Sequence, residues 1–114
     1  METQSGAGAG HKTIVERTRE AMAGMQTVER EIIDQLRNGG TQVTAANFTW
    51  NNGRSLAELP ADLIHLEVRV GSRRVSADLP RVHLEDSHDR IDRWEVRLQI
   101  ERIIKELMPP VPGV

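Results

Sequence analysis

Apolar and polar residues alternate one by one along the middle of the chain, from residue 64 to residue 79. The alternation is interrupted at Gly71-Ser72, a pair that suits a two-residue type II′ turn. The pattern therefore predicts an antiparallel hairpin with one apolar face. Its register pairs Val68 with Val75, Leu66 with Ala77, and Ile64 with Leu79.

The opposite face of this hairpin is polar, and this difference fixes the register. A slip of one residue would bury Glu67 and Arg69 against the core. We expect chemistry or a binding partner to be found first on this polar face. The predicted pairs there are His65 with Asp78, Glu67 with Ser76, and Arg69 with Arg74.

A second pattern, with apolar residues three or four positions apart, predicts a long first helix. The helix begins at a capping box, Thr13 to Glu16, and ends at Asn38, where Gly39-Gly40 supplies a left-handed turn. Ala23 and Gly24 are small enough for another helix to approach closely. The predicted apolar seam comprises Ile14, Thr18, Ala21, Met25, Val28 and Ile32.

The same periodicity predicts a second long helix, which begins at Ser87 or Asp89 and ends at Met108. One apolar stripe on it comprises Val96, Ile100, Ile103, Ile104 and Leu107. A second patch, nearly opposite, comprises Ile91, Trp94 and Leu98. A single sheet can cover only one of the two, so we expect the second patch to contact the first helix or another subunit.

The segment between the first helix and the hairpin has a weaker pattern. Thr41 to Trp50 favours a strand, and a three-residue turn at 51–53 would place Phe48 opposite Leu56 in a second, shorter hairpin. Leu56 to Leu63 is alternatively a loop or one helical turn. The expected fold is α+β, a small, mostly antiparallel sheet of three or four strands packed against two long helices.

Composition limits the classes of function. The chain carries 15 basic and 17 acidic residues, a net charge of −2 and no cysteine. The balance of charges argues against a dedicated electrostatic nucleic-acid binder. The absence of cysteine excludes disulfides and thiolate catalysis. We predict one domain over residues 12–108, a disordered lead-in over 1–11 and a proline-rich tail over 109–114. Because no signal peptide or membrane-length apolar run is evident, we expect a cytoplasmic protein without membrane contact.

Positive charge is concentrated at one end of the hairpin. Arg69 and Arg74 are directly opposed there, which is unfavourable, so we expect a compensating negative charge. That charge comes either from Glu67 or an acid of the second helix, or from an anion, an acidic partner or a nucleic-acid phosphate. The candidate binding residues are Arg69, Arg73, Arg74, Arg81 and Trp94.

The densest cluster of potential metal ligands is the segment 83–89. Its candidate ligands are His83, Glu85 and His88, whose spacing matches no established helical pair of metal ligands. A strand-to-helix connection with a capping residue is favoured here over a metal or catalytic site. We assign no catalytic residue and no cofactor.

The order of helix, strands and helix resembles the outline of the double-stranded-RNA-binding domain. In that family the second helix starts with lysines that contact phosphates, whereas here it starts with Ser87-His88-Asp89. We therefore assign no family on these residues.

The apolar patches together exceed what one small domain conceals, so we expect a homodimer or a larger assembly. The predicted interface comprises Met25, Val28, Ile32, Ile91, Trp94 and Leu98. The expected function is that of a non-enzymatic interaction or regulatory protein, such as an adaptor, inhibitor or sequestering binder. Nucleic-acid binding through the arginine-rich hairpin is the first alternative, and a metal-dependent enzyme at His83–His88 is the second.

Overall fold

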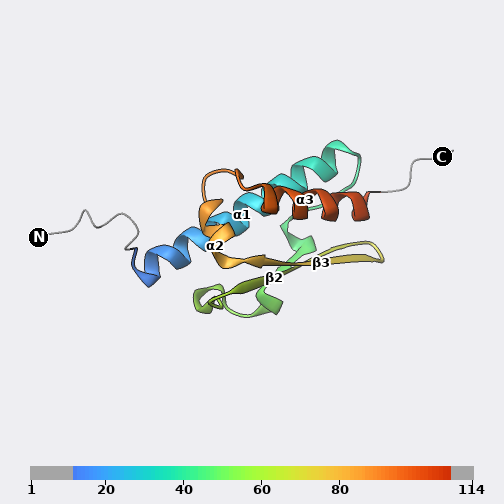
Figure 1. The fold of residues 1–114 in the computed structure, drawn as a ribbon. Helices are drawn as coiled ribbons and strands as arrows, with labels where there is room; N and C mark the ends of the chain where they lie inside the picture. The colour runs from blue at the N-terminus through green and yellow to red at the C-terminus, as the bar shows by residue number, and fades with distance from the viewer. Residues whose placement is uncertain (1–11, 109–114) are drawn as a thin grey trace, which may run out of the picture.

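The computed structural model describes residues 12–108, apart from the side chain of Glu58. The predicted lead-in at 1–11 and the predicted tail at 109–114 lie outside these residues. The described chain forms an α+β fold in which a three-stranded antiparallel sheet, in the order β1-β2-β3, carries its helices on one face (Figure 1). The predicted fold class is confirmed.

The main hairpin has the predicted register. β2 (Leu63–Val70) and β3 (Arg73–Pro80) pair so that Val68 faces Val75 and Arg69 faces Arg74. Gly71 has a φ of +62°, the left-handed value that glycine supplies at this turn. The apolar face is buried and the polar face is open, because alternate side chains of a strand point to opposite faces. Alternation alone was sufficient to place these strands.

The first helix also follows its prediction. α1 (Ile14–Asn38) begins at the Thr13–Glu16 capping box, and Gly40 after its end has a φ of +92°. α2 (Arg81–Asp86) crosses α1 so closely that a Cβ atom on Gly24 would lie 1.8 Å from the carbonyl oxygen of Leu84. The expectation that small residues admit another helix here is confirmed.

The middle segment differs from its prediction. β1 (Phe48–Trp50) pairs with β2, where Phe48 faces Val68, and no hairpin forms between Phe48 and Leu56. Three short 3₁₀ turns, Ala45–Asn47, Asn51–Gly53 and Leu56–Glu58, fill the rest of this segment. Asn51 and Asn52 both have positive φ and the chain forms a 3₁₀ turn at Asn51–Gly53, so the residues after it do not return alongside β1.

The second long helix starts later than predicted. α2 already begins directly after β3, and α3 (Trp94–Leu107) begins only after a connection that buries Ile91. The predicted stripe of α3, from Val96 to Leu107, is buried as expected. α3 packs against β3, while a hydrogen bond of 3.0 Å from Trp50 Nε1 to Glu29 Oε1 holds β1 beneath α1. The two long helices therefore cover opposite edges of the sheet.

Candidate interaction surfaces

Arg73 has a structural contact that the sequence pattern did not predict. Its Nη1 donates to the carbonyl oxygens of Glu106 and Met108, at 3.1 and 2.8 Å. Carbonyl groups at the end of a helix lack partners within the helix and carry its negative dipole end. Arg73 therefore attaches the hairpin to the end of α3.

Arg69 and Arg74 occupy the open face near the hairpin turn. Arg69 donates to the Glu67 carboxylate at 3.2 Å, as one of the predicted compensations requires. Within residues 12–108, no carboxylate lies within ion-pair distance of exposed Arg74. The two arginines and the turn line a shallow concavity of about 400 Å³. Arg74 is thus the arginine of this cluster with a charge still available for a partner.

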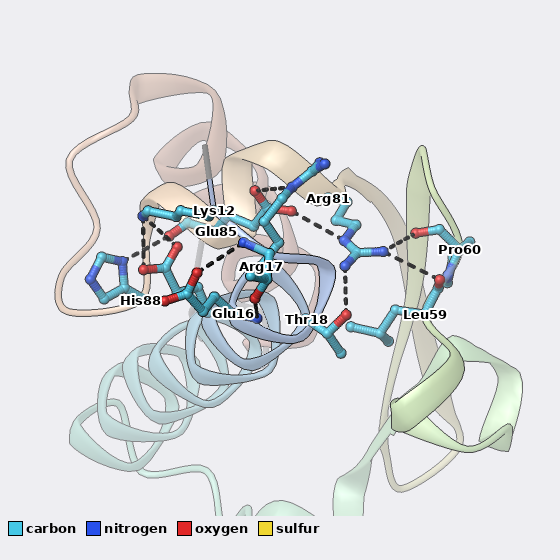
Figure 2. A network of polar contacts seen from close by, with 11 residues as sticks. Lys12, Glu16, Arg17, Thr18, Leu59, Pro60, Arg81, Glu85 and His88 are labelled. Carbon is cyan, nitrogen blue, oxygen red and sulfur yellow. Dashed lines mark hydrogen bonds and ion pairs between the residues drawn. The ribbon is translucent and has the colours of Figure 1, made fainter. Parts of the chain in front are cut away.

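Arg81 does not lie with the other arginines on the hairpin surface, so its predicted place in that positive cluster is wrong. It starts α2, and only 9% of its side chain is exposed. Figure 2 shows its guanidinium between α1 and the loop that precedes β2. Its Nη2 donates to Thr18 Oγ1 at 2.8 Å, and Nη1 donates to the carbonyl oxygens of Leu59 and Pro60. Every guanidinium nitrogen of Arg81 has an acceptor, which offsets the cost of burying the group.

The carboxylate of Glu85 completes this network. It accepts from Arg81 Nε at 3.1 Å and from Arg17 Nε at 3.4 Å, and 13% of its side chain is exposed. A buried carboxylate of this kind needs both partners, since desolvation alone would penalise its charge. The arginine that the sequence grouped with the hairpin therefore joins α1, α2 and the 59–60 loop.

Two charged groups flank this network at the start of α1. Because the backbone N–H of Thr13 donates to Glu16 at 2.9 Å, the pKa of the Glu16 carboxyl is lowered. A hydrogen bond of 2.7 Å to Glu20 raises the pKa of Lys12. Both groups are exposed, and their partners lie in the first two turns of α1, so these contacts stabilise the start of the helix.

The predicted metal-ligand candidates do not form a common site. Glu85 is paired with the two arginines, whereas His88 Nδ1 contacts the carbonyl oxygen of Glu85 at 2.8 Å. His83 lies half-buried on α2. Among residues 12–108, no three His, Asp or Glu side chains are placed to hold a metal ion together. The hypothesis of a metal-dependent enzyme at this segment gains no support from the geometry.

The predicted subunit interface divides into buried and exposed residues. The interface prediction is corrected for the former, because they belong to the core of a single chain: Met25, Val28, Ile32 and Ile91. Trp94 and Leu98, one turn apart on α3, are instead 69% and 54% exposed. Large apolar side chains gathered on a surface are typical of an interaction site. Only these two remain available from the predicted set.

A second apolar surface was not predicted as a site. Ile14 and Val15, with Met22 and Ala57, line an open groove of about 610 Å³ along the first turns of α1. The sequence placed Ile14 in a seam facing the core, but the sheet does not extend beneath this end of the helix (Figure 1). A helical residue faces the core only where the sheet lies beneath its part of the helix, so the length of the helix relative to the width of the sheet decides whether Ile14 is buried or exposed.

The outer edge of β3 is the surface that sequence reasoning missed. In a two-residue hairpin the closing pair, Val70 and Arg73, is hydrogen-bonded, so alternate residues after it direct their backbone groups away from β2. The three outward residues are Arg74, Ser76 and Asp78. Arg102 of α3 confirms this direction, because its Nη2 donates to the Ser76 carbonyl oxygen at 2.7 Å. No further strand pairs with β3 in the described sheet.

Comparisons with known proteins add no functional assignment. No protein-family model, no curated protein and no solved structure matches this chain. None of the helices within residues 12–108 combines the length and apolarity needed to cross a bilayer.

Proposed function

We propose that this protein is a non-enzymatic interaction protein that functions as a homo-oligomer, with a dimer favoured. The observation that carries the proposal is the exposed pair of Trp94 and Leu98 on α3. Tryptophan is enriched among the residues that dominate binding energy at protein interfaces, and its exposure to water is costly. This surface supports contact with another protein chain, as an adaptor, inhibitor or sequestering binder requires.

The polar groups of the chain support a binding role over a catalytic one. The chain contains no cysteine or tyrosine, and the buried charges at Arg81 and Glu85 are occupied by each other and by neighbouring backbone groups. Such pairing holds elements together, so these two buried charges serve the fold. The cytoplasmic location predicted from the sequence stays a prediction.

Light scattering after size exclusion, at several protein concentrations and at low and high salt, tests the proposal. We expect a dimer or larger assembly, and we expect Trp94→Ala to weaken it by roughly thirtyfold or more, since a hot-spot residue contributes at least about 2 kcal/mol. Val82→Ala, which removes another exposed apolar side chain, is the matched control. A wild-type monomer at every concentration would contradict homo-oligomerisation, and an unchanged Trp94→Ala assembly would contradict the role of Trp94.

Nucleic-acid binding is the second candidate, favoured by the concavity that Arg69 and Arg74 line. Phosphate contacts release counterions, so affinity for a duplex DNA fragment should fall steeply with salt. Replacing Arg69 and Arg74 together by alanine should reduce this slope. Arg73 is left unchanged, because its substitution would also disturb the end of α3. An affinity that does not vary with salt would exclude this candidate.

A further inference from the structure

The outward residues of β3 form a self-complementary series. Arg74, Ser76 and Asp78 follow one another at alternate positions, with a positive group, a neutral group and a negative group. If β3 pairs antiparallel with β3 of a second copy about a two-fold axis at Ser76, each Arg74 faces the Asp78 of the other copy. The neutral Ser76 then faces itself. Opposite charges facing each other across antiparallel strands stabilise the pairing.

Other symmetric registers lack this match. Centring the pairing on Arg74 would oppose two arginines, and centring it on Asp78 would oppose two aspartates, both of which are unfavourable. The register centred on Ser76 also joins only backbone groups that already point away from β2, and it would form about six backbone hydrogen bonds. Backbone geometry permits this register, and the charges favour it over the others because only here does each Arg74 face an Asp78.

In the described part of a single chain, Arg74 lacks the acidic partner that this pairing would supply. Arg74 faces the like-charged Arg69 across the hairpin, and within residues 12–108 it has no carboxylate at ion-pair distance. Asp78 is 59% exposed in its side chain and bonds His65 Nδ1 at 2.9 Å. A second copy would bring each free arginine the acidic partner that the hairpin lacks.

We propose that the protein dimerises through β3, forming one continuous six-stranded sheet from the two three-stranded sheets. The inference rests on the proposed homo-oligomer and names the surface that joins the copies. α3 lies against β3, so the two α3 helices would be neighbours across the axis. Trp94 and Leu98 precede Arg102 on α3 by two turns and by one turn, so they share its side of the helix and would lie toward the second copy.

Arg102 must release one contact for this pairing. It covers the Ser76 carbonyl oxygen, and it also binds Gln99 and Glu106 on its own helix. Its side chain is 42% exposed, so it can turn toward Glu106 without breaking a buried interaction. A charged side chain over an edge strand is a common protection against unspecific strand pairing. Arg102 would therefore restrict pairing to a partner strand whose hydrogen bonds to β3 compensate for the lost bond between Arg102 and the Ser76 carbonyl oxygen.

Charge reversal at the edge tests the register. Arg74→Asp should raise the dissociation constant of the dimer roughly ten- to a hundredfold, because two attractive pairs become two repulsive ones. Within one chain the same substitution faces Arg69 favourably, so the hairpin should stay folded. The matched control is Arg54→Asp, which makes the same change of charge at an exposed residue between β1 and β2, away from the β3 edge, and should leave the dimer unchanged.

The double variant Arg74→Asp, Asp78→Arg should restore the dimer, because it inverts both members of each pair. Ser76→Pro is a second test that does not depend on charge. Proline removes an N–H that points to solvent in the single chain, as an edge strand tolerates, and it should abolish the pairing. Molar mass by light scattering at several concentrations, with circular dichroism to confirm folding, measures all variants.

The outcomes separate this inference from the proposed function. A wild-type dimer that Arg74→Asp and Ser76→Pro do not weaken would overturn β3 as the interface and leave a homo-oligomer formed elsewhere. Equal weakening by Arg74→Asp and Arg54→Asp would also overturn it, since only general charge would then matter. A wild-type monomer would overturn both proposals. Loss on Arg74→Asp with recovery in the double variant is the expected result.

Discussion

Arg81 and Arg74 lie seven positions apart, yet the fold gives them opposite environments. Arg81 is buried, and its guanidinium contacts a carboxylate, a hydroxyl and two carbonyl groups. Arg74 is exposed on an edge strand and, within the described residues, has no carboxylate at ion-pair distance. The first holds three segments together, whereas the second has its charge free. A dense cluster of basic residues in a sequence therefore does not identify a single basic surface.

The largest expected effect of a substitution falls on the buried arginine. Arg81→Met should lower the free energy of unfolding by about 3–5 kcal/mol, because the mostly buried Glu85 carboxylate would lose its closest partner. Urea denaturation followed by circular dichroism measures this loss. Arg74→Met, the matched control, should change the free energy of unfolding by less than about 0.5 kcal/mol when both variants are measured at a concentration that keeps them monomeric. Equal losses in the two variants would mean that the environments do not differ as described.

The junction that holds Arg81 can be disturbed without touching the arginine. Gly24→Ala should destabilise the chain by about 1–3 kcal/mol, because the new Cβ atom would collide with the backbone of Leu84 and force α1 and α2 apart. Gly39→Ala is the control. There the added atom would collide with the side chain of Met108, which can move aside, and the nearest backbone atom beyond its chain neighbours is the Leu36 carbonyl oxygen at an ordinary 3.5 Å. A smaller loss at Gly24 than at Gly39 would show that α2 is not rigidly seated on α1.

The hairpin contains a third kind of arginine. Arg73→Ala should lower the free energy of unfolding by about 0.5–1 kcal/mol, since it removes two hydrogen bonds to the exposed end of α3. The dissociation constant of the dimer should not change, because Arg73 does not face the second copy's acidic residue. Urea denaturation and light scattering on the same variant test both statements. If Arg73→Ala weakened the dimer as strongly as Arg74→Asp does, the interface between the two copies would lie at the hairpin turn.

Much of the fold was predictable because it depends on local patterns. The alternation from residue 64 to 79 determines which side chains face the core, and the Thr13 cap and the glycines after Asn38 determine the length of α1. The pairing of β1 was not predictable in this way. Phe48 faces Val68, twenty residues away, so its position depends on competition between distant strands.

The candidate surfaces were predicted less well, for two physical reasons. Arg81 is buried by the carbonyl groups of Leu59 and Pro60, whose loop carries no pattern that places it beside α2. The free edge of β3 follows from strand order, which alternation does not specify. The exposure of Trp94 was predictable, since one sheet cannot cover two opposite sides of a helix.

The smallest expected effect concerns the one residue that links the two sides of this comparison, Arg102. It is paired in the single chain, as Arg81 is, but its partner is the edge that Arg74 occupies. Arg102→Met should change the free energy of unfolding by less than about 0.5 kcal/mol, because the site is exposed. The dimer should become roughly two- to fivefold tighter, since the Ser76 carbonyl no longer has to release an exposed hydrogen bond.

Lys105→Met is the control for Arg102→Met, because it removes one positive charge from the same helix and should leave the dimer unchanged. Light scattering on both variants gives the comparison. A weaker dimer in Arg102→Met alone would mean that Arg102 contributes a contact across the axis. Arg102 would then hold segments together as Arg81 does, but the segments would belong to two copies. The dimer interface would then include α3 as well as β3.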